Sequence, residues 1–224
     1  MKILIIEDEQ ELAQNIGDYL AQEDYLCEFA TTIAEAQSKI ADHSYDCILL
    51  DLMLSGGDGL ILLEEFNTRN RKDGIIIISA KNSFDDKIKG LKSGADDYLE
   101  KPFHLPELAA RIFSIIRRKQ FGKVNVIQQG ELRIDLLGKT VQVHQTPVIL
   151  TRKEFDLLLY FISNQKKVVS KNALAEHLSG DIADMLDNHD FVYAHIKNLK
   201  RKLSEAGCAG YLKTIYGSGY KWEI

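Results

Sequence analysis

Five side chains that could do chemistry together stand at the carboxyl ends of apolar, strand-like runs in the first half of the chain. They are Glu7, Asp8, Asp51, Ser79 and Lys101. Three carboxylates held close together repel one another, so a divalent cation would neutralise them, and Mg²⁺ prefers oxygen ligands. A carboxylate can also be the nucleophile that accepts a phosphoryl group. Asp51 suits that role because it stands alone after its run, whereas Glu7 and Asp8 are neighbours.

The same chemistry gives roles to Lys101 and Ser79. An ammonium and a hydroxyl can hold the oxygens of a transferred phosphoryl group, by charge and by hydrogen bond respectively. Taken singly, each residue has a simpler interpretation. An aspartate after a strand is usually a turn former or a helix N-cap, a lysine is usually solvated, and a serine is usually a loop residue. The phosphoryl-transfer interpretation therefore depends on all five residues meeting at one edge of a sheet.

The elements that must bring them together alternate between strand and helix. Strands are expected at 2–6, 26–30, 46–50, 74–79 and 97–99. Helices are expected at 10–22, 34–41, 60–69, 84–92 and 105–119. Runs that are apolar throughout indicate a parallel sheet covered on both faces. Right-handed crossovers then give a doubly wound, five-stranded α/β fold, in which ligands bind beyond the carboxyl ends of the strands where the strand order reverses.

The second half of the 224-residue chain has a different charge balance. Residues 1–121 hold 14 Lys/Arg and 22 Asp/Glu, a formal charge of −8, whereas residues 122–224 hold 14 and 11, a formal charge of +3. An acidic half beside a basic half suggests a polyanionic partner for the basic one. A short polar connector with a glycine separates them. We therefore expect a first domain at 1–120, a linker at 121–125 and a second domain at 126–224.

The second domain reads as a winged helix-turn-helix. Extended segments are expected at 131–135, 140–144 and 147–150, helices at 153–164, 171–178 and 189–205, and a terminal hairpin at 212–215 and 220–224. In the third helix, four apolar residues at spacings of four, three and four form a stripe for burial: Val192, Ile196, Leu199 and Leu203. The other positions would expose Tyr193, Lys197, Asn198, Lys200, Arg201 and Lys202. Such a face fits the major groove of DNA, although a solvated amphipathic helix would have the same stripe.

Several blocks of this sequence resemble a known family. IIEDE (5–9), LLDLML (49–54), ISAK (78–81) and GADDYLEKPF (94–103) are similar to the signature blocks of receiver domains. LTRKEFDLL (150–158) and GSGYKW (217–222) are similar to blocks of the winged-helix effector domains that accompany them. Together they resemble the OmpR/PhoB-type two-component response regulators over essentially the whole chain.

The resemblance implies a phosphorylation chemistry. It implies Mg²⁺ at Glu7, Asp8, Asp51 and the carbonyl of Met53, and phosphoryl transfer from a sensor histidine kinase to Asp51, with slow self-dephosphorylation at most rather than enzymatic turnover. It also implies a cis peptide bond before Pro102, the residue type that most readily allows one.

The resemblance also implies a switch. Ser79 would move toward the phosphoryl group and Tyr98 would turn inward. The family more often has threonine where this chain has Ser79, so the hydroxyl remains and a methyl group is lost.

A dimer face is implied as well. In this family the phosphorylated receiver forms a homodimer through its fourth helix, fifth strand and fifth helix. Two pairs of charged residues stand where the family's cross-dimer pairs lie: Lys87 with Glu107 and Asp97 with Arg111. Lys92 and Phe113 occupy the positions of a third pair, which this chain lacks. Exposed ion pairs contribute little each, and a merely solvated charge run is the alternative.

In the second domain, the resemblance implies contacts to double-stranded promoter DNA. The contact residues would be His195, Lys197, Asn198, Lys200 and Arg201 on the third helix and Tyr216 on the wing. Lysines would meet phosphates, and Asn198 could read adenine. Asp190, Phe191 and Tyr193 depart from the family's usual arginine, threonine and aspartate, and Asn198 and Tyr216 replace frequent arginines. Fewer arginines suggest weaker single-site binding and paired, A·T-rich direct repeats. The segment 179–187 is a candidate contact for RNA polymerase by analogy alone.

Two other functions fit parts of the chain. A small α/β phosphatase or phosphotransferase could turn over phosphate esters at Asp51, but it leaves residues 124–224 unexplained. A regulator with a vestigial pocket is the second alternative, and the complete set of five pocket residues argues against it. No apolar run is long enough to span a membrane and no signal peptide precedes the first strand, so a cytoplasmic location is expected. The three cysteines lack metal-ligand spacing and read as inert thiols.

Overall fold

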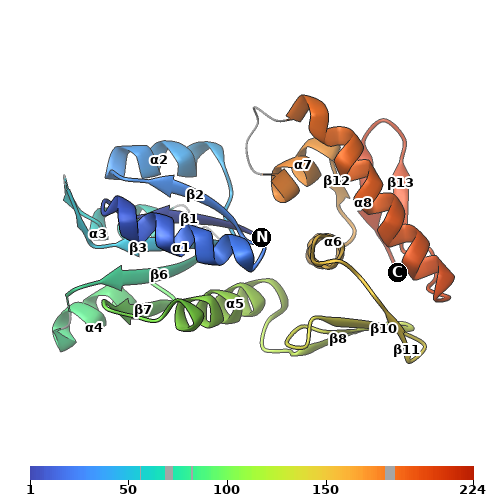
Figure 1. The fold of residues 1–224 in the computed structure, drawn as a ribbon, viewed down its shortest axis with the longest axis horizontal. Coiled ribbons are helices and arrows are strands. Elements are labelled where there is room, and N and C mark those ends of the chain that lie inside the picture. Colours follow the sequence, from blue (N-terminus) through green and yellow to red (C-terminus); the bar gives the residue numbers. More distant parts are fainter. Residues whose placement is uncertain (56, 69–72, 82, 180–184) are drawn as a thin grey trace. The chain divides into compact units, whose positions relative to one another are not determined.

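A computed structural model describes residues 1–55, 57–68, 73–81, 83–179 and 185–224. The chain divides into two compact units, Met1–Gln120 and Phe121–Ile224 (Figure 1). Among the described residues, no helix is both long and apolar enough to cross a membrane.

The first unit is built around a parallel sheet. Its strands are β1 (Lys2–Ile6), β2 (Leu26–Ala30), β3 (Cys47–Asp51), β6 (Gly74–Ser79) and β7 (Asp97–Glu100), in the order β2-β1-β3-β6-β7. The helices are α1 (Gln10–Gln22), α2 (Ile33–Asp42), α3 (Leu60–Thr68), α4 (Phe84–Lys92) and α5 (Leu105–Phe121). The predicted doubly wound, five-stranded fold is confirmed, and the strand order reverses between β1 and β3. A short hairpin of β4 (Met53–Leu54) and β5 (Gly57–Asp58) follows β3 and was not expected from the sequence.

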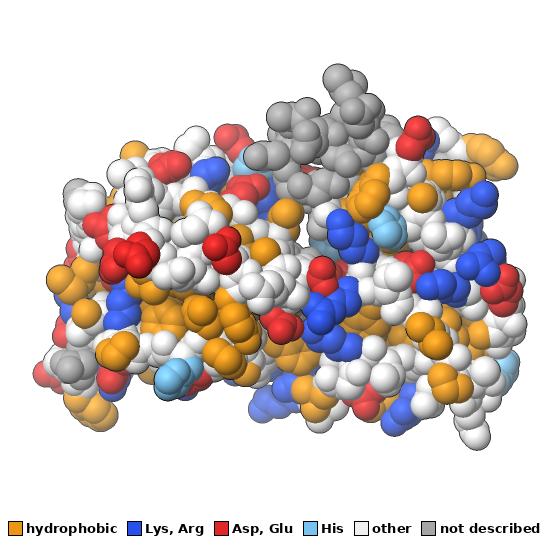
Figure 2. All heavy atoms as spheres, viewed as in Figure 1, with side chains coloured by type: hydrophobic (Ala, Val, Ile, Leu, Met, Phe, Trp, Pro, Cys, Tyr) orange, Lys and Arg blue, Asp and Glu red, His pale blue; other side chains and the backbone are white. Residues whose placement is uncertain are grey.

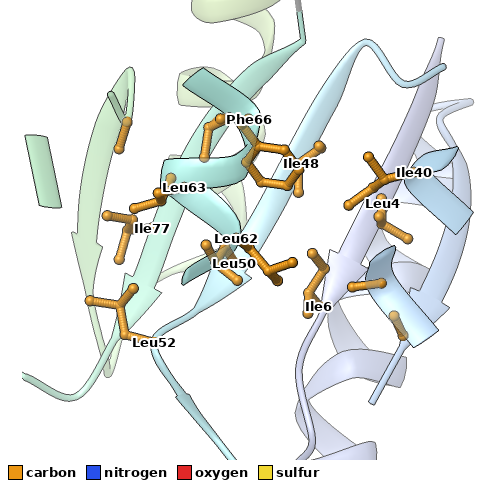
Figure 3. Close-up of a cluster of buried hydrophobic side chains, with 14 of the residues drawn as sticks. Leu4, Ile6, Ile40, Ile48, Leu50, Leu52, Leu62, Leu63, Phe66 and Ile77 are labelled. Carbon is orange, nitrogen blue, oxygen red and sulfur yellow. The ribbon is translucent and has the colours of Figure 1, made fainter. Parts of the chain in front are cut away.

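Successive strand residues point to opposite faces of this sheet, and helices bury both faces. On one face, Leu4, Ile6 and Leu50 pack with residues of α2 and α3 such as Ile40 and Leu62 (Figure 3). The other face packs against α1 and α5 in a second cluster that includes Ile3, Ile5, Leu49, Ile16 and Ile112. The two clusters hold the strands in register, so the residues after each strand emerge at one common edge.

The opposite edge of the sheet is fixed by aspartates that stand immediately before strands. Asp46 precedes β3 and accepts a hydrogen bond from the Lys2 backbone N–H at the start of β1 (2.7 Å). Asp96 precedes β7 and accepts from the N–H of Ile75 in β6 (2.9 Å). Asp46 also accepts from the side chain of Gln120 (2.7 Å), which ties the end of α5 to the same edge. These carboxylates therefore hold neighbouring strands together where they begin.

The described residues of the second unit form two small sheets and three helices. The first sheet has β8 (Val126–Gln129), β9 (Leu132–Asp135), β10 (Thr140–Val143) and β11 (Thr146–Val148) in the order β11-β10-β9-β8. The helices are α6 (Arg152–Ser163), α7 (Lys171–Ser179) and α8 (Met185–Glu205), and the second sheet joins β12 (Val168–Val169), β14 (Gly219–Trp222) and β13 (Leu212–Ile215). The predicted winged helix is confirmed. The strands β8 and β12 were not expected, and α8 begins four residues before the predicted start.

The hairpin of β13 and β14 depends on a close approach of two backbones. Gly219 has a φ of +140°, pairs with Ile215 of β13 and immediately precedes Tyr220, the residue of β14 that pairs with Val169 of β12. A Cβ atom at this position would collide with the carbonyl oxygen of Val169. Only glycine combines this conformation with this approach, so Gly219 joins the wing hairpin to the rest of its sheet.

The two sheets of the second unit are connected through Glu131, beside the start of β9. Its carboxylate accepts hydrogen bonds from the Ala209 backbone N–H (2.5 Å) and from the Tyr211 hydroxyl (2.6 Å). These hydrogen bonds lower the pKa of Glu131 to about 2 and raise that of Tyr211 to about 12. The contact fixes the segment that leads into the wing strand β13.

Replacing Asp46 by alanine should destabilise the first unit by about 1–3 kcal/mol, because a partly buried backbone N–H and the Gln120 amide lose their acceptor. Urea unfolding followed by circular dichroism measures this. Asp42→Ala, an exposed aspartate at the end of α2, is the matched control and should change stability by less than about 0.5 kcal/mol. Equal effects of the two variants would contradict the role assigned to Asp46.

Acid should loosen the second unit through Glu131. Because the folded-state pKa lies below the ordinary value of 4.5, the Glu131 contacts stabilise the fold above pH 4.5, and this stabilisation is lost as the pH falls toward 2. Trp222 is the only tryptophan and its ring lies 5.7 Å from that of Tyr211, so its fluorescence reports unfolding here. Glu131→Gln should be less stable at neutral pH and less sensitive to acid. An unchanged acid dependence would refute this account.

Candidate functional site

The five residues expected to do chemistry meet at the carboxyl edge of the parallel sheet. Glu7 and Asp8 follow β1, Asp51 is the last residue of β3, Ser79 is the last residue of β6, and Lys101 follows β7. Glu7, Asp51 and Ser79 are buried, and Asp8 and Lys101 are partly buried. The site lies where the strand order reverses between β1 and β3, which is the usual ligand position in open α/β sheets.

Lys101 connects the carboxylates of this edge. Its Nζ lies 2.6 Å from an oxygen of Asp51 and 2.7 and 2.9 Å from the two oxygens of Glu7. The peptide bond between Lys101 and Pro102 is cis, as expected. One ammonium thus faces two buried carboxylates from different strands, a contact that the sequence could suggest only through strand order.

The charges at this site shift the ionisation of its members. Burial raises the pKa of Glu7, and the charge of Asp51 raises it further, although Lys101 opposes both effects. Burial would lower the pKa of Lys101, but its hydrogen bonds to Asp51 and Glu7 raise it above the ordinary value. Hydrogen bonds from Ser55 lower the pKa of Asp8. The local excess of negative charge therefore favours a bound cation.

The carboxylates of Glu7, Asp8 and Asp51 could share one metal ion. One oxygen from each lies within 4.8 Å of the others. All three are hard oxygen donors of the kind that Mg²⁺ prefers, and three carboxylates beside one lysine leave about two negative charges uncompensated. The residues present therefore fit a divalent cation.

Two positions of the site, Ser55 and Gly59, were missed from the sequence, and Met53, expected only as a carbonyl ligand of the metal, also contacts Asp51 through its N–H. The Met53 N–H donates to Asp51 Oδ1 (2.8 Å), and the Ser55 N–H donates to Asp8 Oδ2 (2.8 Å). At Gly59, a Cβ atom would lie 2.6 Å from the carbonyl oxygen of Asp51. The glycine-rich run at 56–59 was the available signal, because it predicts a turn that allows close backbone approach. The contact that requires Gly59 is seen only in the folded structure, where the end of β3 lies against this turn.

Ser79 and Tyr98 lie near one another beside this pocket. The Ser79 hydroxyl accepts from the Lys81 N–H (3.2 Å), and the Tyr98 hydroxyl donates to the Lys81 carbonyl (2.6 Å). Burial raises the pKa of Tyr98, and the Ser79 hydroxyl opposes that shift. Both side chains thus hydrogen-bond the same residue of the β6–α4 loop.

The residues expected to pair across a dimer have partners within the chain. Arg111 binds Asp97 and Glu107, each at 2.7 Å. Lys87 forms an ion pair with Glu100 rather than with Glu107. Lys92 is exposed and Phe113 is partly buried. The structure therefore gathers Lys87, Asp97, Glu107 and Arg111 on α4, β7 and α5.

The predicted stripe of α8 is buried, and the opposite face is largely exposed. Val192, Ile196, Leu199 and Leu203 belong to the core of the second unit. Lys197, Asn198 and Arg201 are exposed, and several Lys and Arg side chains lie on the surface over α8 (Figure 2). His195 is partly buried, and burial and the nearby Lys153 lower its pKa, so it is mainly neutral at pH 7. Tyr216, at the tip of the wing, is 95% exposed.

Two lysines of α8 differ from the sequence expectation of free exposure. Lys200 is partly buried and donates to the Thr214 hydroxyl of β13 (3.0 Å), which connects α8 to the wing. Lys202 is bound to the buried carboxylate of Glu154 in α6 (2.7 Å). Helical periodicity gives the angle of a side chain around its helix, but these long side chains bend toward carboxylate and hydroxyl partners that it does not reveal. Arg201 pairs with Glu205 (2.8 Å) and stays exposed.

The segment 180–184, the centre of the candidate polymerase contact at 179–187, lies outside the described residues.

Comparison with known proteins matches both units. Residues 3–113 match the response regulator receiver domain family, and residues 145–222 match the C-terminal domain of transcriptional regulatory proteins. The second match accounts for the part of the chain that a phosphatase would leave unexplained.

Relatives cover the chain almost completely. It is 35% identical over 220 residues to the transcriptional regulatory protein PmrA of Pectobacterium parmentieri, covering 98% of this chain and 96% of that protein. It is 35% identical over 223 residues to the transcriptional regulatory protein CiaR of Streptococcus pneumoniae, covering 98% and 97%. Among solved structures, the receiver domain of the Francisella response regulator 1452 is similar with a TM-score of 0.51 and 37% identity, covering 52% of this chain and 97% of that one. The chain therefore belongs to the OmpR/PhoB-type two-component response regulators, as a DNA-binding transcriptional regulator with a receiver domain and a winged-helix domain.

Proposed function

We propose that Asp51 accepts a phosphoryl group from a sensor histidine kinase. The observation that carries this proposal is the placement of Lys101 between Asp51 and Glu7, with Nζ 2.6 Å from Asp51. Asp51 Oδ1 is held by the Met53 N–H, which leaves Oδ2, now bound to Lys101, as the oxygen to attack phosphorus. The O–P bond forms as the P–N bond of the kinase phosphohistidine breaks, and the neutral imidazole leaves with the kinase. When phosphorylation occurs, Lys101 and the Ser79 hydroxyl stabilise the transferred oxygens by charge and hydrogen bond.

Glu7, Asp8, Asp51 and the carbonyl of Met53 would hold Mg²⁺ in this site. The metal ion, when bound, would offset the negative charge that a phosphoryl group brings to an already acidic edge. Ser79 and Tyr98 form the switch. Since both hydrogen-bond to Lys81, a movement of Ser79 toward phosphate releases the loop contact and lets the Tyr98 ring turn inward.

Phosphorylation promotes a homodimer through α4, β7 and α5. In the single chain, Arg111 pairs with Asp97 and Glu107, and Lys87 pairs with Glu100. In the dimer, these basic residues must exchange such partners for acidic residues of the second copy. Because exposed ion pairs are weak, this exchange costs little. Residues 121–125 link the two domains. The regulator acts in the cytoplasm. RNA polymerase is a further candidate partner there.

The dimer then presents two winged helices to direct repeats in promoter DNA. Lys197, Asn198 and Arg201 of α8 face the major groove, with His195 at the border of that face, and Tyr216 of the wing reaches the adjacent backbone or minor groove. Lys200 supports this arrangement through its hydrogen bond to Thr214, which holds the wing strand β13 against α8. With few arginines on the face, paired binding adds the affinity that one site lacks.

Incubation of the full chain with Mg²⁺ and acetyl phosphate should add the mass of one phosphoryl group, because Asp51 is a positioned nucleophile. Intact-mass spectrometry measures the adduct. Asp51→Asn should show none, whereas Asp58→Asn, an exposed aspartate in the neighbouring hairpin, should show the parent's adduct. An adduct that persists in Asp51→Asn would overturn the assignment. No adduct and no phosphate release in the parent would favour the vestigial-pocket alternative, and release of inorganic phosphate over many rapid turnovers without an accumulating adduct would favour the phosphatase.

Charge reversal at Arg111 should separate phosphorylation from dimerisation. Arg111→Glu should accept the phosphoryl group like the parent but stay monomeric at concentrations where the phosphorylated parent is a dimer, since it would repel Asp97 and Glu107 of the second copy. Analytical ultracentrifugation measures the association. Arg133→Glu makes the same charge change on an exposed position of β9 and should dimerise normally. A phosphorylated Arg111→Glu that dimerises like the parent would exclude this face.

A further inference from the structure

The exposed face of α8 carries a row of three residues that are mixed in chemical character. Phe191, Ala194 and Asn198 follow one another at spacings of three and four, so they lie along one line of the helix, turned away from the buried stripe. All three are exposed, and Phe191 keeps 36% of its surface accessible. The row therefore combines an aromatic ring, a methyl group and an amide on the surface proposed to enter DNA.

The ring of Phe191 is held in place by its neighbours. The His195 ring meets it edge-on, with centroids 4.4 Å apart and an interplanar angle of 81°. From α6, the Lys153 ammonium lies 4.5 Å from the centroid of the Phe191 ring. These contacts fix the ring on two sides without covering it. A ring ordered in this way presents apolar surface to a partner at little further entropic cost.

Ala194 sets how closely that partner can approach. It stands between Phe191 and Asn198 in the row and exposes only a methyl group. A small residue there lets the helix backbone lie near the floor of a groove. Asn198 at the end of the row can pair with the N6 and N7 edge of adenine, and the thymines of A·T pairs present their C5 methyl groups in the same groove.

We propose that Phe191, with Ala194, reads the C5 methyl groups of thymines next to the adenine contacted by Asn198. Apolar contact by alanine or phenylalanine is the way in which protein side chains distinguish a thymine methyl. The proposal rests on the proposed docking of α8 in the major groove and adds a specificity determinant to it. Phe191 thus serves specificity in addition to its packing against His195 and Lys153.

Replacing thymine by uracil removes only the methyl group, which makes the test specific. The duplex is the one that the full-length phosphorylated chain selects from a random pool, and single thymines in each half-site are changed to uracil in turn. At one or two positions per half-site, the parent should bind about three- to fivefold more weakly, the value of one buried methyl group. Phe191→Ala should bind thymine and uracil duplexes equally at one of those positions, and Phe191→Leu should keep part of the preference.

Two comparisons complete this experiment. Tyr216→Ala changes an aromatic on the wing instead of α8 and should keep the parent's preference for thymine whatever its overall affinity. Equal binding of thymine and uracil duplexes by the parent, or an unchanged preference in Phe191→Ala, would overturn the reading of methyl groups while leaving the DNA-binding function intact. Failure of the phosphorylated parent to select any sequence would instead remove the docking of α8, and this proposal with it.

Discussion

Repulsion among carboxylates gathered at one edge of a parallel sheet is the constraint on which the receiver domain depends. The sheet brings Glu7, Asp8 and Asp51 together because parallel strands all end on the same side, and burial strengthens their mutual repulsion. Lys101 compensates part of this charge through three close contacts. The uncompensated charge is what a divalent cation would neutralise in the proposed site, and it makes the proposed phosphorylation of Asp51 a strong local perturbation.

The rest of the receiver domain holds that edge while leaving a few side chains free to respond. Two apolar clusters fix the strands from both faces, and Asp46 and Asp96 clamp the opposite edge. The backbone around the pocket is therefore held from both faces of the sheet and at its far edge. Ser79 and Tyr98 are each connected to Lys81 by one hydrogen bond. In the proposed switch, phosphorylation would exchange these two contacts while the surrounding backbone stays in place.

The winged-helix domain uses its polar contacts in a similar way. Glu131 and Lys200 fix β13 relative to β9 and α8, so the wing hairpin and α8 are held together. Lys202 satisfies the buried Glu154 and does not take part in that surface. Among the described residues, the exposed face of α8 carries aromatic side chains, Phe191 and Tyr193, beside polar ones such as Lys197, Asn198 and Arg201.

The sequence by itself determined the architecture and the five pocket residues. Periodicity reveals strands and helices, and since parallel strands must share an edge, Glu7, Asp51 and Lys101 could be placed together without coordinates. Tertiary structure decided which oxygen of Asp51 faces Lys101, that Ser55 and Gly59 support the site, and that β8 and β12 exist as short paired strands. It also decided that Lys200 and Lys202 bind partners in their own domain. These features depend on residues far apart in the chain, and local pattern carries no record of which distant groups a flexible side chain will reach.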